Sequence, residues 1–439
     1  MRLSEKIENY LNVLNGIDPY KVNGKIVQVI GMIVESIGPS VSIGEICTIK
    51  SRNGDDMAIA EVVGFRNNRV LSMVLGDVSK ISPGNEIVAS GKPFIIGVGP
   101  KLLGRVINGL GEPLDDKGEL EIEEYSTIYN DAPHPLNRKR VLESISTGIR
   151  AIDTLLTMGK GQRMGIFAGS GVGKSVLLGM IARNTSADVN VISLVGERGR
   201  EVRDFIERDL GQEGLKRSVV VVSTGEQPAL IRIKAAFIAT TIAEYFRNRG
   251  LDVMLMMDSI TRVAMAQREV GLAIGEPPTT KGYTPSVFSM LPKLLERAGN
   301  SNNGSITGLY TVLVDGDDMN EPIADASRSI LDGHIVLTRK LASAGHYPAI
   351  DVLQSISRVM PDVTNDKHKE LATKLLDLLA TYTESEDLIN IGAYVKGSNP
   401  KIDKAISMIQ PIRDFLKQKI DEKTTFEESL KKLSMLMAE

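Results

Sequence analysis

Apolar residues in the middle of the chain form short continuous runs, separated by longer stretches with helical spacing. The runs are MGIFA (164–168), NVISLV (190–195), SVVVVS (218–223), DVMLMM (252–257) and LYTVLV (309–314). Such runs are typical of parallel strands that are covered on both faces. Because a helical segment at 228–250 lies between two of them, the pattern predicts an α/β domain, which we place at residues 93–361.

A different pattern precedes this domain. Short β-branched runs alternate with turn signals such as Asn53-Gly54 and Pro83-Gly84. The runs lie at 25–34, 45–50, 57–65, 69–75 and 86–91. Several short strands at this spacing predict a small barrel or sandwich over residues 25–92.

The two ends of the chain are expected to be helical. Beyond residue 361 the strand signals vanish, and three segments with helical spacing predict a helical domain over residues 362–439. Near the start, Leu3, Ile7, Tyr10, Leu11 and Leu14 fall on one face of an amphipathic helix within residues 1–24. This pattern is equally consistent with a helix packed on its own domain and with a helix that docks on a partner.

Composition narrows the class of protein. The 439 residues include 52 Lys and Arg against 55 Asp and Glu, so the net charge of −3 argues against binding of nucleic acid through bulk charge. The single cysteine, Cys47, excludes an internal disulfide and a cysteine-rich metal site, and it favours a reducing cytoplasm. No apolar run approaches the ~18–20 residues that span a bilayer, and the N-terminus lacks the apolar stretch of a secretory signal.

The strongest chemical signal follows the run at 164–168. The sequence there is Ala168-Gly169-Ser170-Gly171-Val172-Gly173-Lys174-Ser175, and a helical segment begins at Val176. Strand, glycine-rich turn and helix in this order predict a P-loop, in which backbone N–H groups and the positive end of the helix face phosphate. We expect residues 169–176 to bind ATP, with Lys174 at the outer phosphates and the Ser175 hydroxyl at Mg²⁺.

Two carboxylates follow other predicted strands. Asp258 ends an apolar run and suits a second Mg²⁺ ligand, although a cap of the following helix is an alternative. Glu197 comes two residues after another run, where a carboxylate can orient and polarise the attacking water. A surface pair of Glu197 with Arg198 is the alternative interpretation, and Glu201 and Glu207 are competing carboxylates.

An arginine far along the chain is a further candidate. Arg358 ends the string SISR at the end of the α/β region. Such an arginine can act as a finger on the nucleotide of a neighbouring subunit. The residues alone leave this role open, because most arginines are solvated or paired.

The motifs occur in an order that resembles a known family. GSGVGKS, GERGREV, MMDSITR, GEPPTTKGYTPSVFSMLPKLLERAG and YPAIDVLQSISR follow one another as in the catalytic subunits of rotary ATP synthases and their export-ATPase relatives. GRVINGLGEPLD and DGDDMNEPIADASRSILDGHIVLTR are similar to type III secretion ATPases, with the strongest likeness to the flagellar branch. The resemblance extends from Gly24 to the C-terminus.

This resemblance implies a fold and a set of residue roles. The fold would be an N-terminal β-barrel, a RecA-like P-loop core of the α/β class and a C-terminal helical domain. The catalytic residues would be Lys174, Glu197, Arg198 and Arg358, and the Mg²⁺ ligands would be Ser175 and Asp258. Arg358 would act in trans, on the nucleotide of a neighbouring copy.

The resemblance also implies a cellular role. The chain would form a cytoplasmic homohexamer that hydrolyses ATP with Mg²⁺ and energises flagellar protein export at the inner face of the cell membrane. Its partners would be a stator-like regulatory protein at the N-terminal helix, a central coiled-coil stalk, membrane proteins of the export gate, and export chaperones with their substrates. Nucleic acid is not an expected partner.

The chain departs from the rotary catalytic subunits at two places, and both differences help to choose among the possible functions. Rotary catalytic subunits carry an adenine-stacking aromatic where this chain has Lys369, and an acidic rotor-facing loop where it has VKGSNPKID; both differences favour an export ATPase. A subunit of an ion-driven synthase and a RecA-like hexameric helicase are the alternatives, and the predicted barrel offers the helicase few aromatics for base stacking. The choice between a flagellar and an injectisome system stays open.

Overall fold

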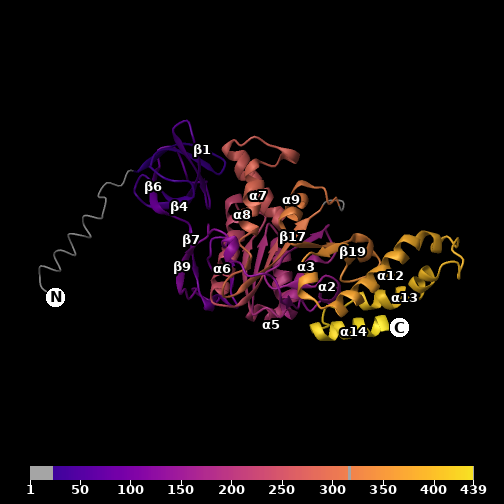
Figure 1. Cartoon of the computed structure of the whole chain (residues 1–439). Helices are drawn as coiled ribbons and strands as arrows, with labels where there is room; N and C mark the ends of the chain where they lie inside the picture. Colours follow the sequence, from indigo (N-terminus) through magenta and orange to yellow (C-terminus); the bar gives the residue numbers. More distant parts are fainter. Residues whose placement is uncertain (1–22, 315–317, 439) are drawn as a thin grey trace, which may run out of the picture. The chain divides into compact units, whose positions relative to one another are not determined.

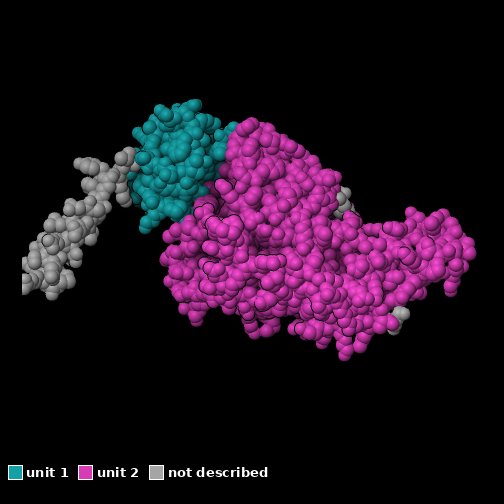
Figure 2. Space-filling model, in the orientation of Figure 1, with its two compact units in different colours: residues 1–94, 273–275 teal, residues 95–272, 276–439 magenta. Residues whose placement is uncertain are grey.

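The computed structural model describes residues 23–314 and 318–438. They form two compact units, of which the first contains the described residues up to Phe94 together with Ala273–Gly275, and the second the remainder (Figure 2). The amphipathic helix predicted near the N-terminus lies outside the described residues. Within the described ranges, no helix is long and apolar enough to cross a membrane.

The first unit contains a closed barrel of antiparallel strands (Figure 1). The strands are β1 (Gly24–Ile30), β2 (Ile33–Ile37), β3 (Glu45–Lys50), β4 (Asp56–Arg66), β5 (Arg69–Val74) and β6 (Glu86–Pro93). They pair in the order β1-β2-β5-β4-β3-β6, and pairing of β1 with β6 closes the ring. Val34, Ile49 and Val62 are among the buried residues that fill the interior.

The structure corrects one detail of the predicted barrel. The apolar run at 25–34 looks like a single strand, but it is divided into β1 and β2, which pair as a hairpin. Gly31 at the turn has a φ of 56°, a left-handed conformation that interrupts an extended strand.

The second unit is built on a nine-stranded sheet with the path β19-β18-β12-β17-β15-β13-β14-β8 and β16 paired to β17. The strands are β8 (Val106–Asn108), β12 (Arg163–Ala168), β13 (Val189–Val195), β14 (Ser218–Ser223), β15 (Asp252–Asp258), β16 (Gly299–Asn300), β17 (Ser305–Leu313), β18 (Gly333–Leu337) and β19 (Ile350–Ser357). Along the path from β8 to β18 neighbours are parallel, whereas β19 is antiparallel to β18. All residues of β13 and β14 are buried, as in a sheet with both faces covered.

Helices alternate with these strands along the chain. They are α2 (Arg150–Leu155), α3 (Lys174–Asn184), α4 (Gly199–Asp204), α5 (Gly211–Lys216), α6 (Ala229–Asn248), α7 (Ile260–Ile274), α8 (Pro285–Leu295), α9 (Pro322–Ile330), α10 (Arg339–Ser343) and α11 (Met360–Val363). A π-helical turn, η3 (Phe205–Leu210), joins α4 to α5. Two short sheets pair β7 (Ile95–Val98) with β9 (Glu124–Thr127) and β10 (Ser144–Ile145) with β11 (Met158–Gly159).

The last part of the chain is helical. Its helices are α12 (Asp366–Asn390), α13 (Pro400–Leu416) and α14 (Phe426–Ala438). Leu375, Phe415 and Leu433 of these helices belong to the same buried core as Ile166 of β12, so the helices pack directly on the nucleotide-binding region. The predicted fold class, with a barrel, an α/β core and C-terminal helices, is confirmed, while the residue boundaries between the predicted domains stay predictions.

Candidate active site

A glycine-rich loop joins β12 to α3 at the carboxyl edge of the sheet. β12 ends at Ala168 and α3 begins at Lys174. Gly171 and Gly173 have φ angles of 78° and 90°, left-handed conformations that residues with a side chain rarely adopt. A loop of this shape directly before a helix N-terminus suits an anion.

The Lys174 side chain forms an ion-paired triad with two carboxylates. Its Nζ lies 2.5 Å from Oδ1 of Asp258 and 3.6 Å from Oε1 of Glu197. Thr311 of β17 donates a hydrogen bond to the same Asp258 oxygen at 2.7 Å. The three triad side chains are between 4% and 16% exposed, so their charges are largely withdrawn from water.

Strand order explains why these residues meet. β17 separates β12 from β15, and β13 lies on the other side of β15, so all three predicted motifs leave the same edge of the sheet. Asp258 is the last residue of β15. After β13, Gly196 adopts a φ of 73° and its amide donates to the Ser223 carbonyl at 2.7 Å, which turns the chain just before Glu197.

Burial and charge shift the proton affinities in the triad. Burial raises the pKa of Glu197 to about 7, and the nearby Asp258 adds to this rise while Lys174 counteracts it. Burial acts against the charged form of Lys174, but the carboxylates of Asp258 and Glu197 outweigh it, and the pKa of Lys174 is raised. Glu197 can therefore exchange a proton near neutral pH, as a general base must.

The same place offers oxygen ligands for a cation. Ser175 stands in the first turn of α3 and is half-buried, while Asp258 at the end of β15 is buried. A hydroxyl and a carboxylate are the hard oxygen donors that Mg²⁺ prefers, so the chemistry of the two predicted ligands fits this metal.

Arg198 lies apart from the triad. It directly precedes α4, and its side chain is 88% exposed and pairs with Glu201 at 3.8 Å. The structure thus brings Lys174, Glu197 and Asp258 together but leaves Arg198 at the surface beside them.

Arg358 lies at the amino ends of the parallel strands, opposite to the carboxyl ends where the triad lies. Ser357, which precedes it, faces Gly333 at the start of β18, and β18 runs parallel to β12. Arg358 is therefore close to the amino end of β12, whereas its own P-loop follows the carboxyl end, roughly 16 Å away along the strand. Its side chain is exposed.

A largely apolar cavity of about 1250 Å³ opens beside the P-loop. Its lining includes Gly171, Gly173, Val176, Tyr347, Phe415 and Gln418. The Tyr347 ring lies 3.5 Å from the position that a Cβ on Gly173 would take, which places an aromatic face or edge next to the phosphate loop. A nucleobase suits such a cavity, because aromatic rings and bases stack. Lys369 does not line this cavity and pairs with Asp366 at 3.4 Å.

Tyr347 and Arg262 are two residues near the triad that the sequence did not predict. Arg262, in the first turns of α7, lies against Gly196, since a Cβ there would approach the arginine side chain to 2.9 Å. Its buried Nε has no hydrogen-bond partner among the described residues. Both residues stand inside quoted motif strings, Tyr347 in YPAIDVLQSISR and Arg262 in MMDSITR, and position in those strings is the only signal for them.

A phosphate loop after a parallel strand, with a lysine held by two acidic strand ends, defines a P-loop nucleoside triphosphatase. Family models agree along the chain. The ATP synthase alpha/beta family matches residues 26–91 with its beta-barrel domain and residues 148–357 with its nucleotide-binding domain. The T3SS EscN ATPase C-terminal domain matches residues 364–435.

Individual relatives cover nearly the whole chain. The flagellum-specific ATP synthase of Bacillus subtilis (strain 168) is 56% identical, with 98% of this chain and 99% of that protein covered. The assembled ATPase EscN of the enteropathogenic E. coli type III secretion system is 47% identical, with a TM-score of 0.90 over 94% of this chain and 100% of that one. EscN in complex with its central stalk EscO gives a TM-score of 0.87 at 46% identity, over 94% and 100% of the two chains.

The chain therefore belongs to the family of flagellum-specific and type III secretion ATPases. The predicted ATP hydrolase of this family is confirmed. The relatives favour this prediction over a subunit of an ion-driven synthase and over a helicase.

Proposed function

We propose that the chain hydrolyses MgATP at the triad, and that the P-loop holds the phosphates. Lys174 releases its two carboxylates and turns its charge to the outer phosphates, while loop amides contact phosphate oxygens. The contacting loop comprises Gly169, Ser170, Gly171, Val172, Gly173, Lys174, Ser175 and Val176. Ser175 and Asp258 would hold Mg²⁺, which would neutralise phosphate charge.

Glu197 is the proposed general base. Its carboxyl group is buried next to Lys174 and titrates near neutral pH, as a base that accepts a proton from water requires. Arg262 contacts the transferred phosphate from α7, and Arg198 contributes from the start of α4. Tyr347 stacks on the base in the adjoining cavity, in place of the aromatic that Lys369 replaces.

Arg358 is the proposed finger on the nucleotide of a neighbouring copy. The observation that carries this proposal is its position at the sheet edge opposite to its own P-loop. One chain thus holds both halves of a composite site, and a head-to-tail ring of identical copies completes every site. The assembled EscN relative supports a homohexamer.

The cellular proposal follows the family. The ring energises export of flagellar proteins, and the EscN–EscO complex supports a central coiled-coil stalk in its middle. We place the ring in the cytoplasm, at the inner face of the cell membrane, where it meets membrane proteins of the export gate, export chaperones and their substrates. The N-terminal helix predicted from the sequence is the proposed binding site of a stator-like regulatory protein, and nucleic acid is not a proposed partner.

A mixture of two inactive variants tests the composite site. Lys174→Ala removes the P-loop cation and Arg358→Ala the finger, and each change alone should abolish most ATP hydrolysis, since fingers of this kind are worth roughly 10³–10⁵ in rate. In mixed rings some interfaces join an intact P-loop to an intact finger, so activity should partly return. Absence of recovery in rings shown to contain both variants would contradict a finger that acts in trans.

A further inference from the structure

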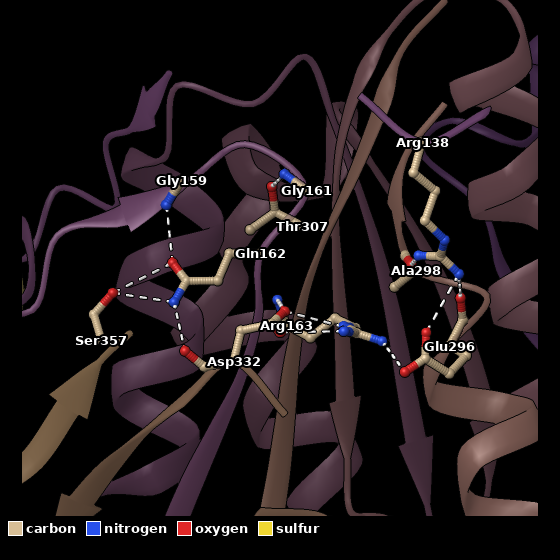
Figure 3. Close-up of polar contacts among 10 residues, drawn as sticks. All are labelled: Arg138, Gly159, Gly161, Gln162, Arg163, Glu296, Ala298, Thr307, Asp332 and Ser357. Carbon is tan, nitrogen blue, oxygen red and sulfur yellow. Dashed lines mark hydrogen bonds and ion pairs between the residues drawn. The ribbon is translucent and has the colours of Figure 1, made fainter. Parts of the chain in front are cut away.

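A buried polar network lies at the amino end of β12 and includes Ser357, the residue before Arg358 (Figure 3). Its centre is Gln162, which is fully buried and immediately precedes β12. The Gln162 Nε2 donates to Oγ of Ser357 at 3.0 Å and to the carbonyl of Asp332 at 3.1 Å. One amide nitrogen thus joins the residue before Arg358 to the residue before β18.

Asp332 is also the partner of the Arg358 backbone. The Arg358 N–H donates to the Asp332 carbonyl at 3.0 Å, the same oxygen that accepts from Gln162. The Asp332 carboxylate accepts from the Arg163 backbone N–H and Nε, each at 3.0 Å. Because Arg163 begins β12, the strand that leads to the P-loop also fixes the carbonyl that holds Arg358.

The other half of the Gln162 amide holds its own loop. Its Oε1 accepts from the Gly159 N–H at 2.9 Å, and Ser357 Oγ donates to the Thr157 carbonyl at 2.8 Å. A Cβ on Gly159 would lie 3.1 Å from side-chain atoms of Val359, so loop 157–162 and the chain after Arg358 are in close contact. The amide nitrogen and the amide oxygen of Gln162 both form hydrogen bonds. An ionised Glu lacks the donor and Leu lacks both groups, so neither residue can make the same contacts.

The network is anchored beyond this contact. Arg163 Nη1 lies 2.5 Å from Glu296 Oε1, and Arg138 Nη1 donates to the Ala298 carbonyl at 2.8 Å while its Nη2 contacts Glu296 (Figure 3). These contacts tie the start of β12 to the end of α8 and to β16. The backbone of Arg358 is therefore held by groups on several elements, although its guanidinium is exposed.

We propose that Gln162, with Ser357 and Asp332, positions the Arg358 finger for the active site of the neighbouring subunit. This proposal rests on the proposed function, in which Arg358 acts in trans. A side chain that reaches across a subunit boundary needs a fixed origin, since a displacement of about 1 Å can cost ~10²-fold in rate. Gln162 acts through Arg358 and serves a site that is not in its own chain.

The test measures MgATP hydrolysis of the full chain with Gln162→Leu. We expect kcat to fall about 10–100-fold at ring-forming concentrations, with nucleotide affinity of the monomer within twofold of wild type. Thr307→Val is the matched control: Thr307 is equally buried and accepts from Gly161 at 2.9 Å, one residue from Gln162 but outside the contact with Ser357. This control should keep kcat within about twofold. Ser357→Ala, a smaller change, should reproduce part of the Gln162→Leu loss and guards against a folding defect.

Mixed rings separate positioning of the finger from damage to the subunit's own site. Gln162→Leu mixed with Lys174→Ala should regain activity, because the Lys174→Ala copy presents an intact finger to the intact P-loop of its neighbour. Gln162→Leu mixed with Arg358→Ala should not, because neither copy presents a well-placed finger. The reverse pattern, or no gain in either mixture, overturns the positioning role. If mixed rings of Lys174→Ala and Arg358→Ala also show no recovery of activity, the trans role of Arg358 is contradicted. The positioning role of Gln162 is then contradicted as well.

Discussion

Glu197 holds its carboxyl group where the charged form is disfavoured. The pKa of about 7 comes from burial and from Asp258, and is moderated by Lys174. In the nucleotide-free protein the cost of the Glu197 charge is therefore part of the folding energetics. An active site that holds an ionisable group in an unfavourable environment commonly lowers the folding stability of the protein.

Glu197→Gln should separate these two effects. The amide cannot accept a proton from water, so turnover should fall by at least about 10²-fold while ATP still binds. A folded-state pKa above the ordinary 4.5 means that the Glu197 contribution to stability is fully present below pH ~4.5 and is lost as the pH rises through about 7. The variant should therefore nearly match wild type in thermal unfolding at pH 5 and exceed it at pH 8, by roughly 3 kcal/mol. Glu207→Gln, at an exposed carboxylate paired with Arg203, should change neither turnover nor the pH profile.

At the scale of elements, the cavity beside the P-loop, which is the proposed site of the nucleobase, is assembled from parts distant in sequence. The connection from α10 to β19 carries Tyr347, and the segment after α13 carries Gln418, whose backbone N–H donates to the Tyr347 carbonyl at 2.9 Å. The Gln418 side chain accepts from the Arg150 N–H at 2.8 Å and donates to the Gly148 carbonyl at 2.8 Å. The segment after α13 thus connects the start of α2 to Tyr347, whose aromatic ring lies beside the P-loop.

Tyr347→Ala should weaken ATP binding more than it slows chemistry. Stacking of a base on an aromatic ring is worth about 1–3 kcal/mol, so KM for ATP should rise between about 5- and 150-fold with kcat nearly unchanged. Tyr347→Phe keeps the ring and should retain the wild-type KM. Steady-state kinetics of both variants check this, and an unchanged KM in Tyr347→Ala would place the base elsewhere.

Much of the architecture was predictable at this scale, for a physical reason. β13, β14 and β15 are buried on both faces, and their uninterrupted apolar residues predict them as strands. β19 is the outermost strand of the sheet, and exposed residues stand between its buried ones. Its pattern is therefore mixed, and it does not form a continuous apolar run. Asp258 and Glu197 were predictable because strand ends meet at one edge. Gln162 was not, because its partners are 170 and 195 residues away in sequence.

At the scale of the whole molecule, one chain carries the P-loop, the Glu197 carboxylate and the Arg358 side chain. Two of these lie at the carboxyl ends of the parallel strands and the third at their amino ends. In the proposed trans arrangement, a lone copy does not complete its own site, and assembly is part of the proposed catalytic mechanism.

Specific activity should accordingly rise steeply with protein concentration. Dilution separates P-loops from fingers, so the ATPase rate per subunit should drop by the ~10³-fold or more that a finger contributes. Arg358→Ala should show a low rate with little dependence on concentration. Rates measured beside a sizing experiment at each concentration check this, and full activity in a proven monomer would contradict the ring requirement.

Strand β12 has a consequence for the order of events in such a ring. Its carboxyl end opens into the phosphate loop of its own subunit, and its amino end is tied through Gln162 and Asp332 to Arg358, the proposed finger for the next subunit. A hydrogen-bonded strand of six residues in the middle of a sheet transmits a displacement without shortening. In the proposed ring, a shift of the phosphate loop would therefore have a hydrogen-bonded path toward the finger of one neighbour and not of the other.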